Sequence, residues 1–504
     1  MILVWVLLLP LLGGLIGWAG SGVSRRLSQY APAAALCLDI LLLIWLWGKQ
    51  SGSADHSQST MWIASFTAPW VPQLGLSFSL AMDGLALLMA LMSCIVSLAV
   101  VVALGARSEK DTGLYSLLNM SAVTAVLGVF LATDLLLFFI CFEAMLLPAY
   151  ALLIGWGEGD QSRSATRFFL FTQFGGLLML ISILALYVAN GQSTGEYTFA
   201  YEALLANRIS GPLAYLGLIG FLIAFACKLP VVPFHTWQPD TYSGAPTGVS
   251  ILLSALMAKT AGFGLIRYAI PLFPDVASVV SPLVMGFGVF TILYCSWLAF
   301  AQKDLKRIVA YSSAAHLGYV VLGVFAMNEI GQRGAIIQMF CHGLSVAGVF
   351  LVVDVVERHA GTRDIDALGG LWSYAPRLGA LALIFAMATL GLPGLGNFIG
   401  EFLTLAGAFQ LYPIAAAGGA VGAVLAAAYS LHLLQKVFFG PRRESGEGAE
   451  VHAPTIGVLT VLAALLLFAG FFPQPLLSAA STAIGAGEKQ KIEALPMIAS
   501  GERP

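Results

Sequence analysis

The sequence predicts an all-α polytopic membrane protein, and three observations support this fold class. Of the 504 residues, 59% are hydrophobic and only 10% are charged. The mean hydropathy of +0.88 is far above what a soluble domain can expose to water. Apolar runs of about 20 residues, the length of helix that crosses a bilayer, recur along the chain.

These apolar runs delimit about 14 candidate transmembrane helices. They lie near 2–19, 29–48, 79–104, 114–132, 134–155, 166–190, 212–235, 245–270, 276–301, 306–327, 331–356, 376–411, 412–437 and 455–475. The stretch at 376–411 is too long for one straight crossing, so we expect a bent or broken helix there.

Two of the spans carry signals of interruption. Pro230 and Pro233 follow Lys228 in the seventh span, and Pro393 with several glycines precedes Glu401 in the twelfth. Proline removes a backbone donor and clashes with the preceding turn, which predicts a break at both places. Paired broken helices in the two halves of a transporter indicate its ion site. The alternative is that the prolines only shape helix packing.

The positions of the cations predict the orientation. Fifteen of the 24 lysines and arginines lie in or beside loops that follow odd-numbered spans. The positive-inside rule places those loops in the cytoplasm and both termini on the opposite side. The first span has its arginines after the apolar run, which predicts a transmembrane helix rather than a removed signal peptide.

The sequence gives no sign of a cofactor in this chain. The six cysteines are scattered singly, without a C-x-x-C pair, and no phosphate loop, haem motif or iron–sulfur spacing is present. We therefore expect any redox cofactor to belong to another subunit. A net charge of −2 and the lack of a basic tract argue against nucleic-acid binding.

Three ionisable side chains lie where the chain should be surrounded by lipid or protein. Lys228 and Lys259 are placed within the seventh and eighth spans, and Glu143 lies near the centre of the fifth. A charge at the bilayer centre costs about 2.5 to 3.5 kcal/mol on insertion scales, so such residues mark ion pathways. The sequence predicts that Glu143 pairs with Lys228 and that making and breaking the pair switches proton affinity. The alternative is a static pair that only orients helices.

Two histidines sit within polar stripes on apolar helices. Imidazole can take a proton on one nitrogen and release it from the other, which suits a relay. The alternative is that each histidine is a satisfied packing residue. The stripes, spaced at i, i+4 and i+7, are Ser312, His316 and Tyr319 in the tenth span and Gln338, His342 and Ser345 in the eleventh.

Three segments together resemble the antiporter-like, proton-pumping subunits of respiratory complex I and their relatives. They are KLPVVPFHTWQPDTYSGAPTGVSILLSALMAKTAGFGLIRYAIPLFP, AQKDLKRIVAYSSAAHLGYVVLG and ATLGLPGLGNFIGEF. The resemblance implies two inverted five-helix repeats, spans 4–8 and 9–13, in which the broken spans 7 and 12 correspond. The implied parts are N-terminal helices at 1–111, repeats at 112–270 and 271–440, and a C-terminal helix with a tail at 441–504. A glutamate at position 401 favours the M-type branch of the family.

The resemblance also implies a role for each candidate residue. Glu143 is the carboxylate paired with Lys228, Lys259 is the central lysine, and Glu401 is the terminal site. His235, His316 and His342 are linking polar residues. The chain is then a translocase subunit of NADH:quinone oxidoreductase without a cofactor of its own, a multi-pass protein of the bacterial inner membrane. Its partners are adjacent antiporter-like membrane subunits and the lipid bilayer, while NADH and quinone are bound by other subunits.

Two residues depart from the family pattern. Tyr242 stands where the family usually has a histidine, and Asp39, near the middle of the second span, has no recognised counterpart. Subunits of the same build also serve multisubunit Na⁺/H⁺ antiporters, membrane-bound hydrogenases and inorganic-carbon uptake complexes. A structural spacer that holds other pumping subunits is a third possibility. The sequence alone leaves these alternatives open.

Overall fold

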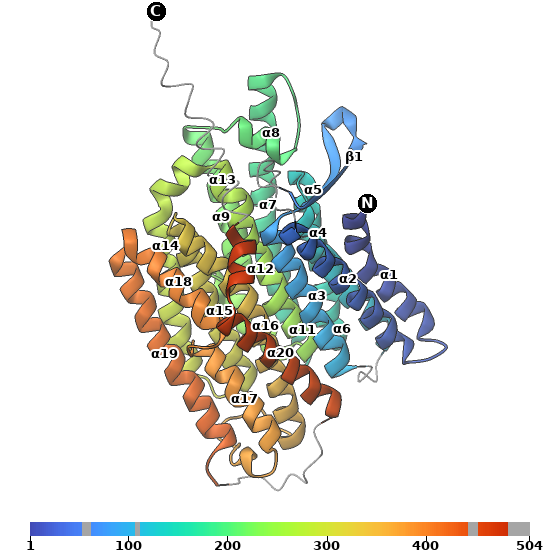
Figure 1. Cartoon of the computed structure of the whole chain (residues 1–504), viewed down its shortest axis with the longest axis vertical. Helices are drawn as coiled ribbons and strands as arrows, with labels where there is room; N and C mark the ends of the chain where they lie inside the picture. The colour runs from blue at the N-terminus through green and yellow to red at the C-terminus, as the bar shows by residue number, and fades with distance from the viewer. Residues whose placement is uncertain (53–61, 106–110, 442–451, 482–504) are drawn as a thin grey trace, which may run out of the picture.

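The computed structural model describes residues 1–52, 62–105, 111–441 and 452–481. Within these residues, twelve helical spans are long and apolar enough to cross a membrane. The uninterrupted ones are α1 (Ile2–Gly20), α2 (Leu27–Gly52), α3 (Gly84–Leu104), α4 (Thr112–Leu131), α7 (Gln161–Thr194), α14 (Pro274–Ala301), α15 (Leu305–Phe325), α16 (Glu329–Ala360), α19 (Pro413–Phe438) and α20 (Ala453–Phe471). They pack roughly side by side in one bundle (Figure 1). The predicted multi-pass helical fold is confirmed, whereas the repeat boundaries remain predictions.

The two predicted breaks are present. Helix α9 (Pro212–Lys228) stops at the lysine, and the chain continues through η2 (Phe234–Trp237) into α10 (Gln238–Gly244). Helix α17 (Pro376–Thr389) is followed by a turn in which Gly391 and Gly394 have φ of 76° and 98°, a region that favours glycine, before α18 (Gly396–Leu411) begins. Because α9 and α17 are shorter than full crossings, the count of about 14 spans stays a prediction.

Two further spans are irregular in ways that the sequence did not predict. The fifth is divided at Met145, two residues after Glu143, into α5 (Leu135–Ala144) and α6 (Leu146–Trp156). The eighth is a run of short pieces, α11 (Thr247–Ile251), η3 (Leu252–Met257), α12 (Ala258–Gly264), η4 (Leu265–Ala269) and α13 (Ile270–Leu272). Its segments η3 and η4 are π-helical and flank the turn that carries Lys259. Such π segments are frequent at functional sites.

A small antiparallel hairpin was also missed. Strand β1 (Ala64–Val71) pairs with β2 (Leu76–Met82) across η1 (Pro72–Leu74). The hairpin lies at the same end of the molecule as the short helix α8 (Tyr201–Ala206) (Figure 1). The predicted third span, which began at residue 79, was therefore wrong at its start, because the apolar end of β2 was counted with the helix although Asp83 separates the two elements.

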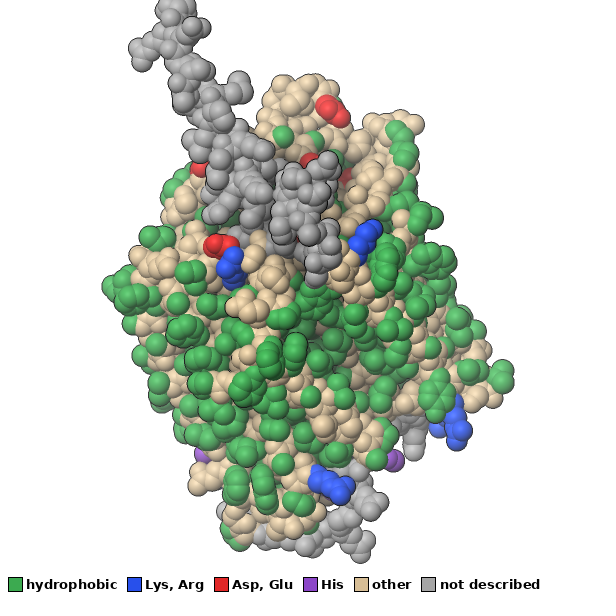
Figure 2. Space-filling view, viewed as in Figure 1, with side chains coloured by type: hydrophobic (Ala, Val, Ile, Leu, Met, Phe, Trp, Pro, Cys, Tyr) green, Lys and Arg blue, Asp and Glu red, His purple; other side chains and the backbone are tan. Residues whose placement is uncertain are grey.

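Burial divides the helices into inner and outer ones. Every residue of α15 other than Arg307 and Tyr311 is buried, as is the whole stretch 247–270, whereas α7 and α14 expose Phe174, Ile181, Phe290 and Trp297. Figure 2 shows apolar side chains over the middle of one face, with charged ones only toward its upper and lower ends. An apolar outer belt around a polar-bearing interior is the arrangement expected in lipid. The short helix η5 (Leu371–Ser373) lies in the loop before α17.

Candidate functional site

Lys259 lies at the centre of the bundle and touches a histidine. Its side chain is fully buried on α12. The ammonium Nζ donates to the carbonyl of Ser254 at 2.6 Å and lies 2.7 Å from Nδ1 of His342 on α16. The Ser254 carbonyl belongs to the π-helical segment η3, so the widened turn supplies an acceptor to the lysine. The Nζ–Nδ1 distance allows direct proton exchange between the two side chains.

The second histidine joins this pair to a carboxylate. The rings of His342 and His316 have centroids 5.6 Å apart. Nδ1 of His316 lies 2.9 Å from Oε1 of Glu401, and Nε2 lies 3.1 Å from the hydroxyl of Tyr429. In the tautomer with the proton on Nδ1, His316 donates to Glu401 and accepts from Tyr429. Both ring nitrogens are thus engaged, as a proton relay requires.

Glu401 is placed by the broken twelfth span. The side chain is 5% exposed, and Oε1 also accepts a hydrogen bond from Gln338 at 3.2 Å. Gly400, beside it, lets α18 approach α16 closely, because a Cβ there would meet the backbone of Gln338. Four predicted site residues therefore form one succession of contacts, Lys259, His342, His316 and Glu401, which we call the central chain. The structure brings these four together, while their roles stay predictions.

A cavity of about 50 Å³ adjoins both histidines of the central chain. That volume is enough for a few water molecules. The hydroxyls of Ser313 and Ser430 have no hydrogen-bond partner within the described ranges, so they are free to bind water. The polar part of the lining comprises Ser312, Ser313, His316, His342, Ser345, Thr389, Tyr429 and Ser430.

Lys228 lies in a different environment at the broken end of α9. Its ammonium donates to the carbonyl of Phe142 at 2.8 Å and sits 3.5 Å from the centroid of the Phe142 ring. That carbonyl belongs to the last turn of α5, before the interruption at Met145. A cation is favoured at the C-terminal end of a helix and over an aromatic face. The kink in the fifth span therefore holds the lysine.

Glu143, next to Phe142, does not form the predicted ion pair. Both of its carboxylate oxygens are buried, and neither has a hydrogen-bond partner in the part of the chain that the structure describes. The carboxylate packs against Gly176 of α7, where a Cβ would collide with it. Lys228 is close enough to interact with it electrostatically, but no ion pair between them is formed. The two are neighbours on either side of Phe142.

His235 and Tyr242 lie apart from the central chain. His235 is on η2, is 7% exposed, and meets the ring of Tyr294 edge-on at 5.6 Å. No contact among the described residues joins it to Lys228 or Lys259. Tyr242 is fully buried, with its ring edge-on to those of Trp237 and Phe350. The structure does not bring these two residues together with the other candidates.

Sequence reasoning missed two features of the buried polar network. One is Tyr429 on α19, whose hydroxyl contacts His316. The sequence feature that could have indicated it is a Tyr–Ser pair in a run of small residues. Arg267 forms a buried ion pair with Asp83, whose other oxygen accepts from the backbone N–H of Ala86 at 2.9 Å and caps α3. An aspartate directly before an apolar run is a recognisable helix-capping signal, which could have predicted the cap but not the pair.

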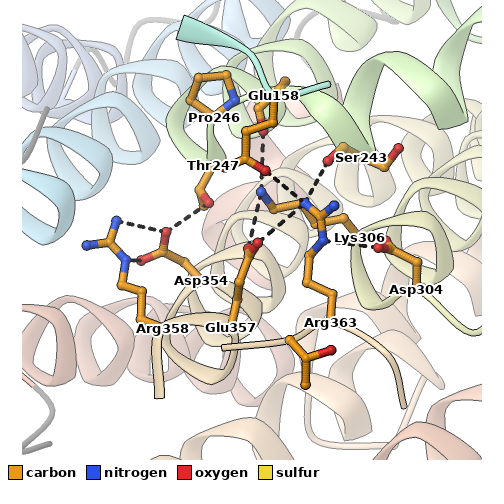
Figure 3. A network of polar contacts seen from close by, with 12 residues as sticks. Glu158, Ser243, Pro246, Thr247, Asp304, Lys306, Asp354, Glu357, Arg358 and Arg363 are labelled. Carbon is orange, nitrogen blue, oxygen red and sulfur yellow. Dashed lines mark hydrogen bonds and ion pairs between the residues drawn. The ribbon is translucent and has the colours of Figure 1, made fainter. Parts of the chain in front are cut away.

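A surface network ties together segments that the cation count assigned to the cytoplasmic side (Figure 3). Arg363 contacts Asp304 at 3.0 Å and Glu357 at 3.4 Å, and donates to the carbonyl of Ser243 at 3.0 Å. Lys306 pairs with the same Glu357 at 3.3 Å. The network joins the start of α15, the end of α16 and the segment before α11. These contacts fix the helix ends on this side relative to one another.

The same end of α16 borders a second, larger cavity. Thr247, the first residue of α11, donates to Asp354 at 2.9 Å, and Arg358 pairs with Asp354 at 3.0 Å (Figure 3). These three residues, with Tyr115 and Asn119 of α4, line a cavity of about 240 Å³. A hydrated space therefore fits at the beginning of the span that carries Lys259.

A multi-pass helical bundle with buried lysines, histidines and carboxylates in succession belongs to the class of ion-translocating membrane proteins. The family model described as NADH:quinone oxidoreductase/Mrp antiporter, transmembrane region, matches residues 132–426. The NADH-quinone oxidoreductase subunit M of Escherichia coli (strain K12) is 40% identical over 494 residues, which cover 96% of this chain and 97% of that protein. The subunit M of Pseudomonas aeruginosa is 40% identical over 492 residues, with 95% and 96% covered. The chain belongs to this family of antiporter-like subunits.

Solved structures agree with this assignment. A chain of respiratory complex I from Thermus thermophilus with bound NADH superposes with a TM-score of 0.85 at 32% identity, covering 96% of this chain and 99% of that one. A chain of the Mrp complex from Dietzia sp. DQ12-45-1b has a TM-score of 0.81 at 20% identity, covering 95% and 96%. The second likeness concerns the fold alone.

Proposed function

We propose that the chain is the M-type, proton-translocating membrane subunit of a respiratory NADH:quinone oxidoreductase. The observation that carries this proposal is the central chain, in which Lys259, His342, His316 and Glu401 succeed one another. Each of these four groups can bind and release a proton. The two short contacts, at 2.7 Å and 2.9 Å, suit proton exchange rather than the binding of a larger ion.

Protons enter from the cytoplasmic side near Lys228 or Lys259, pass along the histidines at mid-membrane and leave by way of Glu401. The larger cavity beside Thr247 supports uptake toward Lys259, because it adjoins the first turn of the same span. The smaller cavity beside the histidines supports hydration of the central chain. Glu143 and Lys228 form the switch that quinone reduction in other subunits acts on.

The chain takes part in the oxidoreductase reaction as a translocase and has no cofactor of its own. NADH and quinone are bound by other subunits, and adjacent antiporter-like subunits flank this one. The protein lies in the bacterial inner membrane with both termini on the periplasmic side. The cation count of the loops supports this orientation.

The test uses the complex purified with its native partners and reconstituted in vesicles. We expect flavin and iron–sulfur subunits to co-purify, and NADH addition to move protons across the vesicle membrane. Glu401→Gln, which keeps the shape of the side chain but not its charge, should abolish the part of pumping that this chain contributes. Co-purification with small antiporter subunits, and Na⁺-dependent proton exchange without NADH, would overturn the proposal in favour of an antiporter.

A further inference from the structure

Asp39 lies inside the N-terminal helices, away from the central chain. It stands midway along α2, and no part of its side chain is exposed. Asp39 lies on the buried face of α2, together with Leu36, Leu43 and Leu46. This face packs against α1 and α3. A carboxyl group at this place is unexplained by the proposed pathway.

The neighbours of Asp39 on α3 can be assigned from the helix register. Gln29, near the start of α2, donates to the carbonyl of Val101, near the end of α3, at 3.4 Å. The two helices are therefore antiparallel, and ten residues farther along α2, about 15 Å, Asp39 reaches the middle of α3. There it lies close enough to Cys94 to interact with it electrostatically. Ser93 and Ser97 lie one residue before and three residues after Cys94 on α3.

In the described part of the chain, buried polar atoms without partners occur on both α2 and α3. Neither oxygen of Asp39 has a hydrogen-bond partner within the described residues, and the same holds for the hydroxyls of Ser93 and Ser97. All three side chains are buried, with at most 4% exposed. Buried polar groups normally find a partner in protein or in bound water. The unpartnered carboxyl group of Asp39 therefore indicates a site for a bound proton or a bound water molecule.

Among the described residues, the helices around Asp39 provide no cation for an ionised carboxylate. Helices α1, α3 and α4 contain no lysine, arginine or histidine. On α2 itself the cation is Lys49, ten residues away, or about 15 Å along the helix, with its ammonium over the ring of Trp45 at 5.7 Å. An ionised carboxylate buried among apolar groups without a cation or a hydrogen-bond donor is strongly disfavoured.

We propose that Asp39 is a second proton-binding site, separate from the central chain, at which the carboxyl group holds its proton. Its O–H can donate and its C=O can accept, so the neutral acid can satisfy both oxygens with a bound water molecule. The neutral state also makes Asp39 a specific modification site for apolar carbodiimides.

The chemistry of that modification is balanced without any oxidant or reductant. The carboxyl proton moves to one carbodiimide nitrogen, and the carboxyl oxygen forms a bond to the central carbon as one C=N bond becomes single. The resulting O-acylisourea then transfers its acyl group to the adjacent nitrogen and gives a stable N-acylurea. An ionised carboxylate cannot supply the proton for the first step.

The first experiment treats the intact complex in native membranes with dicyclohexylcarbodiimide at neutral pH and analyses peptides by mass spectrometry. We expect an adduct on Asp39 but not on Asp366, which is paired with two lysines at the surface. Asp39→Asn, which imitates the neutral acid, should lose the adduct and keep the unfolding temperature of the complex. A clear fall in that temperature would overturn the proposal, because it would show that Asp39 acts as a charge.

A second measurement does not depend on access of the reagent. Infrared difference spectra between the wild-type complex and Asp39→Asn should contain the carbonyl stretching band of a protonated carboxylic acid. Ser97→Ala should shift this band if the hydroxyl is a partner, while the band itself persists. A carboxylate band in place of the acid band would overturn the proposal.

Discussion

The two carboxylates of the proposed pathway are held in opposite ways. Glu401, beyond the break in the twelfth span, accepts hydrogen bonds from His316 and Gln338. Glu143, just before the interruption in the fifth span, has no hydrogen-bond donor within the described ranges. One end of the pathway is therefore preorganised, whereas the other can change partners without first breaking a hydrogen bond. We expect this difference to place the switch at Glu143.

The two lysines also differ in whether their neighbours can exchange a proton with them. Lys259 contacts an imidazole, which can accept its proton, whereas Lys228 contacts a carbonyl and a phenyl ring, which cannot. The ring of Phe142, which meets Lys228, packs against Phe225, and Phe225 packs against Phe138. Among the described residues, contacts between groups that exchange protons connect the members of the central chain and do not extend from it to Lys228.

The largest expected effect follows from Lys259→Met in the central chain. The substitution keeps an apolar stem of similar length but removes the group next to His342. We expect the pumping assigned to this chain to fall by about a hundredfold, the lower end of what the loss of a positioned proton donor costs. The measurement is NADH-driven proton uptake per electron in reconstituted vesicles.

Lys303→Met is the matched control for that experiment. The Lys303 side chain is 74% exposed and pairs with Asp366 outside the predicted spans, so its removal should leave the ratio of protons to electrons unchanged. If Lys259→Met and Glu401→Ala also leave that ratio unchanged, the chain is a structural spacer and the comparison of the two halves loses its functional meaning.

Substitutions at Glu143 should separate pumping from stability. We expect Glu143→Ala to assemble and to lose most quinone-linked pumping, because the carboxylate makes no hydrogen bond that the fold needs. Glu401→Ala should in addition destabilise the protein by about 1 to 3 kcal/mol, since it leaves buried donors of His316 and Gln338 without an acceptor. Full pumping by Glu143→Ala, or equal destabilisation by the two variants, would contradict this account.

Much of the fold and part of the site could be predicted from the sequence. Bilayer thickness fixes helix length, so apolar runs located nearly all spans, and backbone chemistry placed the breaks after Lys228 and around Pro393. The histidines at 316 and 342 were identified because a polar stripe on an apolar helix is rare. These signals are local, and each depends on residues within a few turns of one another.

The unpredicted features depend on tertiary contacts or on small backbone changes. The π-helical turns beside Lys259 carry no sequence signal of their own. The interruption at Met145 precedes Pro148, which removes a backbone donor from this span, but the break was not predicted from it. Both features decide which carbonyl each lysine meets. The predicted Glu143–Lys228 pair assumed contact between opposite charges. In the structure, the ammonium group of Lys228 instead donates to the carbonyl of Phe142 and lies over its ring. Charge complementarity alone could not foresee this competing acceptor.

A smaller effect should come from Gly176→Ala, which alters the position of Glu143 without removing it. A methyl group at residue 176 would collide with the carboxylate, so the side chain must turn away from α7. We expect the displaced carboxylate to pair with Lys228 and to slow pumping severalfold while assembly is retained. Gly286→Ala on α14, where the added methyl group meets nothing within 4 Å, is the control.

A double variant tests the cause of that effect. Glu143→Asp shortens the side chain, so the combination with Gly176→Ala should relieve the collision and recover more activity than the two single effects predict together. Strictly additive losses would show that residue 176 acts through helix packing and not through the carboxylate.

The smallest effect concerns the surface, where Asp366 connects the loop between α14 and α15 to the end of α19. Its carboxylate contacts Lys303 at 2.9 Å and Lys436 at 3.2 Å. Hydrogen bonds from the two ammonium groups hold the pKa of Asp366 below its usual value of 3.8. A lowered pKa in the folded state stabilises the protein above the usual pKa, and this contribution disappears as the pH falls through the lowered value.

Asp366→Asn should therefore lower the unfolding temperature slightly at neutral pH, and the difference from the wild type should shrink as the pH drops below about 4. High salt should shrink it as well, because the three side chains are partly exposed and their charges are screened. Asp275→Asn, at the start of α14, provides a control without an ion pair in the described structure. If Asp366→Asn lowers the unfolding temperature by the same amount at every pH, the aspartate contributes through packing of the loop. The ion pairs with the two lysines would then not stabilise this part of the molecule.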